Sequence, residues 1–239
     1  DVYKRQPCIG LITASILSKK AAEGIQSLVL DVKFGRAAFM QHSEDARKLA
    51  QSMVRVGTEL GMEVKAQLTQ MDHPIGQWLG NSHEIAESIA CLKGMGPQDT
   101  MELVHAQANA LGFDISESIE NGSALQEFKS MLERQGVEPS LAQQLLDDPW
   151  SVLPRAPQQY TLLAEQSGFV ADLDALAIGQ VLCEAGAGRS KQGEDIDHGV
   201  GIQIHKLIGS QVEVDDAIMT LDGPFGIDMR LIQRLKSSI

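Results

Sequence analysis

The chain has 239 residues, of which 43% are hydrophobic and 22% charged. This length and composition are those of a globular protein with a sizeable core and one or two domains. A formal net charge of −12 argues against nucleic acid or an anionic membrane as partner, and no apolar run reaches the about 18 residues of a membrane-spanning helix.

The cysteines and histidines show no metal-binding pattern. Cys8, Cys91 and Cys183 lie far apart and form no CxxC pair, and the six histidines form no HxxxH-like pair. We therefore expect reduced, mostly buried thiols in a cytoplasmic protein, and no bound metal.

The first predicted element is a helix near residues 9–23 that carries polar groups on an apolar face. One arc of this helix holds Ile12, Ser15, Ile16 and Lys19. A hydroxyl and an ammonium framed by isoleucines are typical of a pocket for a small, flat, polar ligand. The pattern also allows an ordinary alternative, in which the serine bonds a helical carbonyl and the lysine extends into solvent.

A strand–helix–strand unit follows this helix. Residues 28–32 form a short apolar run typical of a buried strand, and residues 63–69 form the next strand. Between them we expect a helix that begins at an N-cap, Ser43, and ends near Leu60 before Gly61. Such a unit predicts two parallel strands in one sheet.

Helices dominate the middle of the chain, and short strands its end. We expect one helix from a cap at Ser82 to about Lys93, a second that begins after Pro97, and interrupted helices over 117–148. The three prolines of 149–157 indicate a linker or subdomain boundary. Beyond it we expect a strand at 168–171, a helix at 175–184, a turn at 186–190, and strands at 199–205 and 211–221.

Several blocks of the sequence resemble the pyrimidine nucleoside phosphorylase family, and in particular its members that act on thymidine. The blocks include SILSKK, DVKFG, LKGMGPQD, NGSAL, LPRA, AGAGRS and DIDHGVGI. The resemblance extends from Gly10 to about Leu221. SILSKK and DVKFG together are its most specific part, because the glycines alone would be a weak signal.

The resemblance implies an α/β fold: a parallel-sheet phosphorylase core with a remnant of a small helical domain and a C-terminal α+β subdomain. The implied segments are an unmatched or non-native leader (1–8), the helical remnant (9–24), the α/β domain (25–150) and the C-terminal subdomain (158–239). Family members begin with a phosphate loop that these residues lack. We therefore expect a truncated fragment that is inactive alone and whose first helix packs poorly.

The resemblance also implies a reaction and a site. Family members catalyse reversible phosphorolysis of pyrimidine deoxynucleosides such as thymidine to free base and 2-deoxyribose 1-phosphate, with phosphate as co-substrate, no cofactor and a homodimeric assembly. By resemblance, Ser15 and Lys19 hold the base, Lys19 acts catalytically on the departing base, and Ile12 and Phe39 line the pocket. A pyrimidinedione offers two carbonyl acceptors and an N3–H donor, which suits a hydroxyl beside an ammonium. Ordinary core packing is the alternative for Ile12 and Phe39.

Two further groups of residues have a structural and a functional interpretation. Asp31 and Lys33 share one face of a strand end, and we favour a mutual pair over a role in chemistry. Some bacterial relatives bind a cation through a carboxylate at the position of Glu87 and carbonyls at Ile75 and Trp78. A solvated or dipole-pairing glutamate is the ordinary alternative.

Two other functions stay open. An enzyme like anthranilate phosphoribosyltransferase would share the fold, but it would need a diphosphate site and metal-binding carboxylates, and SILSKK argues against it. A non-catalytic interaction module is the other alternative. The residues do not decide between thymidine and broader uridine use.

Overall fold

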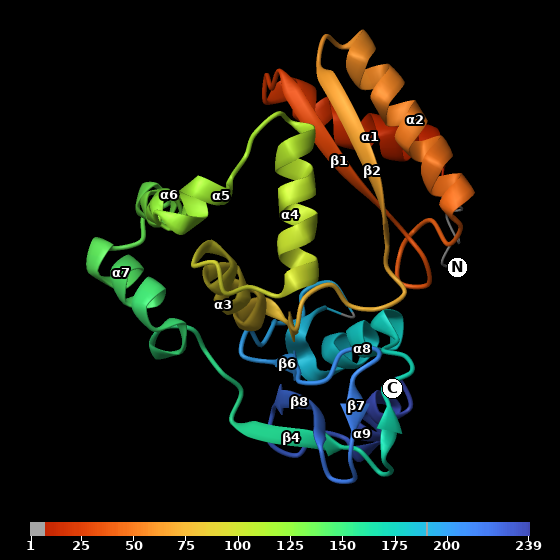
Figure 1. Cartoon of the computed structure of the whole chain (residues 1–239), viewed down its shortest axis with the longest axis vertical. Helices are drawn as coiled ribbons and strands as arrows, with labels where there is room; N and C mark the ends of the chain where they lie inside the picture. The colour runs from red at the N-terminus through yellow and green to blue at the C-terminus, as the bar shows by residue number, and fades with distance from the viewer. Residues whose placement is uncertain (1–7, 190) are drawn as a thin grey trace. The chain divides into compact units, whose positions relative to one another are not determined.

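The computed structural model describes residues 8–189 and 191–239 (Figure 1). The predicted leader at 1–8 therefore lies outside the described residues except for Cys8. The chain divides into two compact units, one made of Asp1–His73 with Val104–Asp114 and the other of Pro74–Leu103 with Ile115–Ile239. The segment boundaries given above stay predictions.

The first unit is a parallel strand pair that packs on two helices (Figure 1). Its elements are α1 (Ile9–Ala22), β1 (Ser27–Phe34), α2 (Ser43–Glu59), β2 (Glu63–Gln70) and the end of α4 (Gln98–Ala110). β1 and β2 run parallel, with Leu28 opposite Val64 and Val32 opposite Leu68. The even-numbered residues of both strands face the helices, because side chains alternate along a strand. The predicted parallel pair is confirmed.

Helix α1 packs better than we expected. Leu17 is 1% exposed, and the Thr13 hydroxyl donates to the Ser52 hydroxyl of α2 at 3.1 Å. One face of α1 is therefore part of the core, and the expectation of poor packing is wrong for that face.

Two predicted helix caps are wrong. Ser43 is the first residue of α2 and follows the N-cap residue His42, which makes no side-chain cap bond. Helix α3 (Asn81–Leu92) has Gly80 as its N-cap, with Ser82 buried inside the helix. Gly80 has a φ of 112°, and a Cβ there would lie 2.5 Å from the carbonyl oxygen of Val200. Only glycine therefore fits at the N-cap position of this helix.

The second unit combines helices with small antiparallel sheets. Its helical elements are α3, the start of α4, α5 (Ser116–Glu120), α6 (Ser123–Arg134), α7 (Pro139–Asp147), η1 (Pro149–Ser151), α8 (Ala175–Leu182), η2 (Cys183–Ala187) and α9 (Met229–Lys236). Its strands are β3 (Trp78–Leu79), β4 (Gln158–Leu163), β5 (Gly168–Phe169), β6 (Gly201–Ile204), β7 (Gln211–Val212) and β8 (Ala217–Gly223). The sheet orders are β3-β6-β8-β4 and β5-β7. The α/β class with a C-terminal α+β region is confirmed.

The C-terminal sheet differs from the expectation in two ways. The predicted strand at 211–221 is two strands, β7 and β8, because the chain turns at Asp215, where φ is 70°. The pairing of β3 with β6, which places Trp78 opposite Gln203, had no local signal. β4 and α9 were also not foreseen. Among the described residues no helix has the length and apolar content to cross a membrane.

Candidate functional site

A cavity of about 470 Å³ in the first unit brings two predicted site residues together. Ile12 and Ile16 of α1 line it, as do Leu30 and Val32 of β1, Phe39 and Met40 of the following loop, and Leu49 and Met53 of α2. Most of the lining is therefore apolar and comes from α1, β1, the loop after β1 and α2, while Asp31 and Lys33 of β1 add two charged side chains. Such a cavity suits the ring of a small ligand.

The loop after β1 presents Phe39 at this cavity. The amide of Gly35 donates to the carbonyl of Met40 at 2.9 Å, which folds the loop back on the strand end. Met40 is 5% exposed and belongs to the core, whereas Phe39 is 81% exposed. Gly35 has a φ of 118°, and a Cβ there would lie 2.5 Å from the Asp72 carboxylate. The glycine of DVKFG is therefore required by its backbone and by the close carboxylate.

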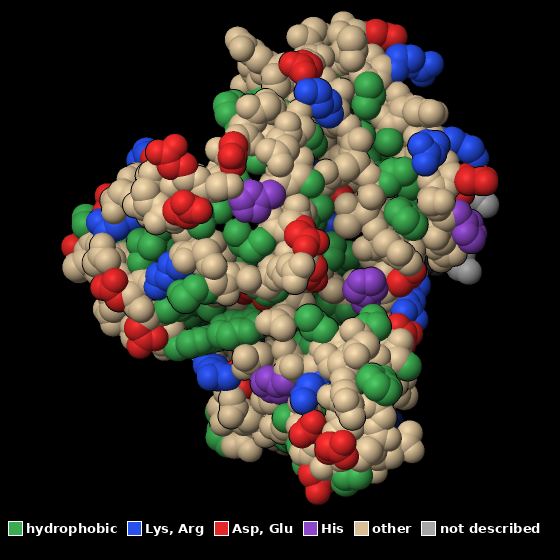
Figure 2. All heavy atoms as spheres, viewed as in Figure 1, with side chains coloured by type: hydrophobic (Ala, Val, Ile, Leu, Met, Phe, Trp, Pro, Cys, Tyr) green, Lys and Arg blue, Asp and Glu red, His purple; other side chains and the backbone are tan. Residues whose placement is uncertain are grey.

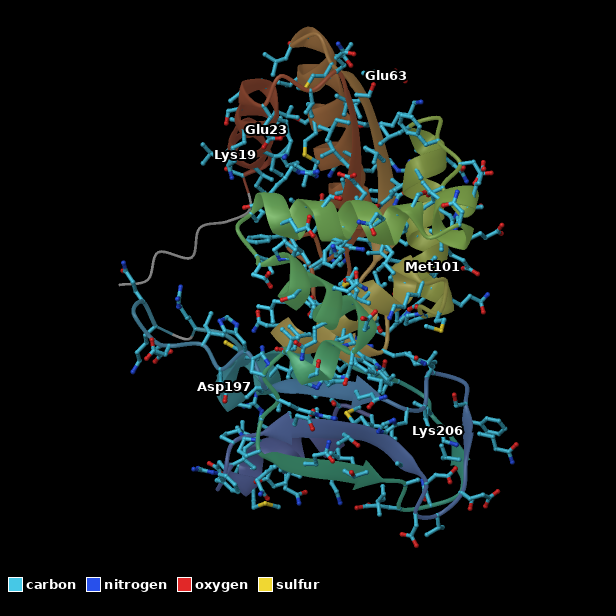
Figure 3. All side chains as sticks on the ribbon, turned by 90° about the vertical axis from the view of Figure 1, so that its left-hand side faces the viewer. Lys19, Glu23, Glu63, Met101, Asp197 and Lys206 are labelled. Atoms are coloured by element: carbon cyan, nitrogen blue, oxygen red, sulfur yellow. The ribbon has the colours of Figure 1, made fainter. Side chains whose placement is uncertain are left out.

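Ser15 and Lys19 are exposed on α1 and are not among the residues that line the cavity. Figure 3 labels Lys19 on α1, and in the described part of the chain its ammonium has no hydrogen-bond or ion-pair partner. The neighbouring Lys20 differs, because its Nζ pairs with the carboxylate of Glu23 at 2.9 Å. Of the two lysines of SILSKK, Lys19 is thus the one whose ammonium makes no bond to any described residue.

Asp31 and Lys33 pair with each other, as the structural interpretation predicts. The two charged groups are 2.7 Å apart, and the Asp31 carboxylate also accepts from the Thr69 hydroxyl at 2.6 Å. Gln107 of α4 approaches the same carboxylate at 3.4 Å. The charged groups of Asp31 and Lys33 therefore already have partners within the first unit.

In the second unit, Glu87 binds backbone amides. Its Oε1 accepts from the amides of Gln77 at 2.7 Å and Trp78 at 3.0 Å. Burial raises the pKa of the Glu87 carboxyl; the two amide bonds lower it, and the nearby carboxylates of Asp99 and Glu84 raise it further. The described residues contain no group of three or more His, Cys, Asp or Glu arranged to hold a metal ion. Cation binding at Glu87 stays a prediction.

A buried network around Asp222 was missed by the sequence reasoning. His83 and Asp222 are each 1% exposed, and the His83 Nε2 lies 2.9 Å from the Asp222 carboxylate. The same carboxylate accepts from Arg155 and from the Gln159 amide. Arg155 lies in the LPRA block, one of those that carry the family resemblance, which was the one available hint. Asp222 lies far from its partners in the chain.

Aromatic rings enclose this network. The rings of Trp78 and Trp150 stack at 5.5 Å, and the Arg155 guanidinium lies 4.9 Å from the centre of the Trp150 ring. Gly201 lies against the imidazole, since a Cβ there would be 2.1 Å from the His83 Nδ1. These contacts link α3 to the C-terminal sheet.

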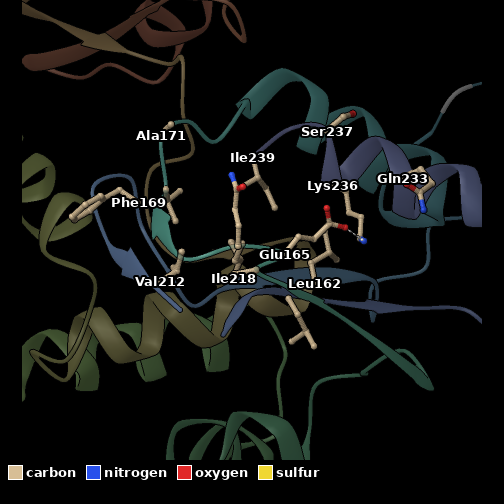
Figure 4. Close-up of a pocket in the computed structure, with 14 residues that line it drawn as sticks. Leu162, Glu165, Phe169, Ala171, Val212, Ile218, Gln233, Lys236, Ser237 and Ile239 are labelled. Atoms are coloured by element: carbon tan, nitrogen blue, oxygen red, sulfur yellow. Dashed lines mark hydrogen bonds and ion pairs between the residues drawn. The ribbon is translucent and has the colours of Figure 1, made fainter. Parts of the chain in front are cut away.

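A second cavity, of about 600 Å³, lies in the C-terminal region (Figure 4). Leu162, Val170 and Ile218 contribute apolar surface, and Glu165 and Lys236 form an ion pair at 2.7 Å at its edge. None of the predicted site residues lines it, so the first cavity is the better candidate for the site.

Comparison with known proteins identifies the family of the chain. Residues 10–132 match the glycosyl transferase family a/b domain, and residues 169–237 match the pyrimidine nucleoside phosphorylase C-terminal domain. The chain therefore belongs to this glycosyl transferase family, and its C-terminal part matches a domain of the pyrimidine nucleoside phosphorylases.

The individual relatives that match the chain are phosphorylases. The chain is 42% identical to thymidine phosphorylase of Homo sapiens over 229 residues, which covers 89% of this chain and 48% of the relative. It is 38% identical to pyrimidine-nucleoside phosphorylase of Bacillus subtilis over 234 residues, which covers 92% and 53%. The chain thus spans about half the length of the curated relatives it matches.

Proposed function

We propose that this chain supplies the base-binding part of a phosphorylase that transfers a pentosyl group between a pyrimidine and inorganic phosphate. The names of the relatives support the reaction class. The observation that carries the assignment of the site is the mostly apolar cavity lined by Phe39 and by Ile12, on a helix that also carries Lys19, whose ammonium has no partner among the described residues. Thymidine as the nucleoside, a homodimeric assembly and a cytoplasmic location are part of the same proposal.

In this reaction a phosphate oxygen forms the new bond to C1′ of the sugar, and the bond from C1′ to the base nitrogen breaks with its electron pair going to the base. Phosphate is a co-substrate, and no further cofactor is needed. The departing base gains negative charge on its carbonyl oxygens. A donor aimed at those oxygens therefore stabilises the transition state more than the ground state.

Lys19 is the donor in this scheme, and Ser15 fixes the orientation of the ring. Ile12 and Phe39 contact the apolar surface of the base, while its carbonyl edge faces the exposed side of α1. An ammonium that already had a carboxylate partner would be less available to the base, and Lys19 has none among the described residues. Its hydration is lost only when the base covers it, so a hydrogen bond to the base must replace the lost water.

Titration of the chain with thymine, followed by ligand-detected NMR, tests the proposal. A charge-assisted hydrogen bond contributes about 1.5–3 kcal/mol, so Lys19→Ala should weaken binding about tenfold or more. Lys20→Ala is the matched control, because it removes the same charge at the residue next to Lys19. Lys20 is already paired with Glu23. The affinity of this variant should stay within about twofold of the original. Equal losses in both variants would refute the assignment of the helix face.

A further inference from the structure

Arg47 and Arg55 differ from the other arginines of the described chain. Six others have a carboxylate or carbonyl partner: Arg36, Arg134, Arg155, Arg189, Arg230 and Arg234. Arg47 and Arg55 have neither an ion pair nor a hydrogen bond to any described residue. The chain has 32 acidic and 20 basic residues, and acidic side chains are spread over the face in Figure 2. Two unpaired guanidinium groups are therefore unexpected in so acidic a molecule.

Both arginines line one groove of about 360 Å³, which we call the β2 groove. Its residues are Arg47, Ala50, Gln51, Val54 and Arg55 of α2 with Ala66 and Leu68 of β2. The two cations are eight residues apart on the helix, or about 12 Å at 1.5 Å per residue. Ala50, Gln51 and Val54 of α2 lie between them along the helix.

The strand that forms one wall of the groove is also open on its outer side. β2 pairs only with β1, and no other described residue bonds along its outer edge. An open edge of this kind offers backbone donors and acceptors to an additional strand. Side chains of that strand on the α2 side would enter the groove.

We propose that the β2 groove binds an extended acidic segment of a partner polypeptide, which adds to the outer edge of β2. Residues four apart in a strand lie about 13 Å apart on one face, which matches the spacing of the two arginines. The segment therefore has acidic residues at positions i and i+4 and an apolar residue at i+2. The acidic residues meet Arg47 and Arg55, and the apolar residue meets Val54 and Leu68.

A labelled peptide, Thr-Thr-Asp-Thr-Val-Thr-Asp-Thr-Thr, is the probe, and fluorescence anisotropy with the whole 239-residue chain measures its binding. The variant Arg47→Gln/Arg55→Gln should lower its affinity at least about tenfold. The control variant Lys48→Gln/Arg134→Gln removes the same charge outside the groove, and its affinity should stay within about twofold. Circular dichroism confirms that each variant is folded.

Two more arms separate strand addition from simple anion binding. Replacing the central Thr-Val-Thr with three prolines keeps the charges and an apolar centre but removes amide donors on both edges of the strand, so this peptide should not bind. The variant Arg47→Glu/Arg55→Glu should instead bind the same peptide with lysines in place of the aspartates. Equal binding of the proline peptide, or displacement of the probe by inorganic phosphate at similar concentration, would overturn the proposal in favour of a small-anion site. Absence of binding by the aspartate peptide would overturn it outright.

Discussion

The polar groups around Asp222 and those on the exposed face of α1 have opposite surroundings. Asp222 is 1% exposed, and three side chains donate to its carboxylate. Ser15 and Lys19 are exposed beside an apolar cavity, and the Lys19 ammonium has no partner among the described residues. A buried charge must be paired within the chain, whereas a group that binds a ligand keeps its donors free. The difference separates polar groups that stabilise the fold from those that act on another molecule.

The largest expected effect comes from removing the buried carboxylate. Asp222→Ala leaves His83, Arg155 and Gln159 without their acceptor, and breaking such a buried pair costs about 3–5 kcal/mol. Urea unfolding should show this loss in the free energy of unfolding. Asp216→Asn is the control, because it removes the charge of a half-exposed carboxylate paired with Lys206, keeps an oxygen that accepts from the Glu213 amide, and should leave the midpoint nearly unchanged. A small effect of Asp222→Ala would mean that the network is not structural.

Much of the first unit was predictable from sequence because its signals are local. Each of its signals spans only a few residues: the apolar run at 28–32, the glycine at position 61 and the strand pattern at 63–69. β1 and β2 form where these signals predict them. The strands of the C-terminal sheet pair across long intervals of sequence. The two residues of β3 acquire strand geometry from β6, which lies more than a hundred residues further along the chain. No local pattern contains that information.

The candidate site was predictable in part for a similar reason. Helical spacing placed Ile12 and Ile16 on one face, and both line the cavity. The same spacing did not show that Ser15 and Lys19 lie outside the lining of the cavity. Their position depends on which side of α1 packs on α2. The pairing of His83 with Asp222 spans 139 positions and required the folded chain.

Glu87 lies between these two cases, because its buried carboxylate accepts from backbone amides but pairs with no Lys, Arg or His side chain among the described residues. Burial raises the pKa of its carboxyl above the ordinary 4.5, so ionisation costs the folded state stability as the pH rises through the raised pKa. The sign is opposite for Asp222. Burial also raises the pKa of that carboxyl, but bonds from His83, Arg155 and Gln159 outweigh burial and leave it below 3.8.

We therefore expect Glu87→Gln to become more stable relative to the original protein as the pH rises above 4.5. The glutamine oxygen still accepts from both amides, so the difference should reflect the charge. Urea unfolding across pH 4–8 measures it, with Glu102→Gln, an exposed change on α4, as the control. A stability difference that instead widens on acidification would contradict the assignment of the raised pKa.

The smallest expected effect is that of Phe39→Ala on stability. The adjacent Met40 allows an exposed residue and a core residue to be compared directly. Phe39 is 81% exposed at the cavity, so Phe39→Ala should leave the free energy of unfolding nearly unchanged. It should weaken thymine binding about three- to tenfold, because an aromatic contact contributes about 0.5–1.5 kcal/mol beyond its buried area. The neighbouring Met40 is 5% exposed, and Met40→Ala should cost about 2–5 kcal/mol of stability. Calorimetric titration with thymine and urea unfolding give both quantities for each variant. If Phe39→Ala destabilised the fold as much as Met40→Ala does, Phe39 would be a core residue and the cavity would lose its apolar contact for the base.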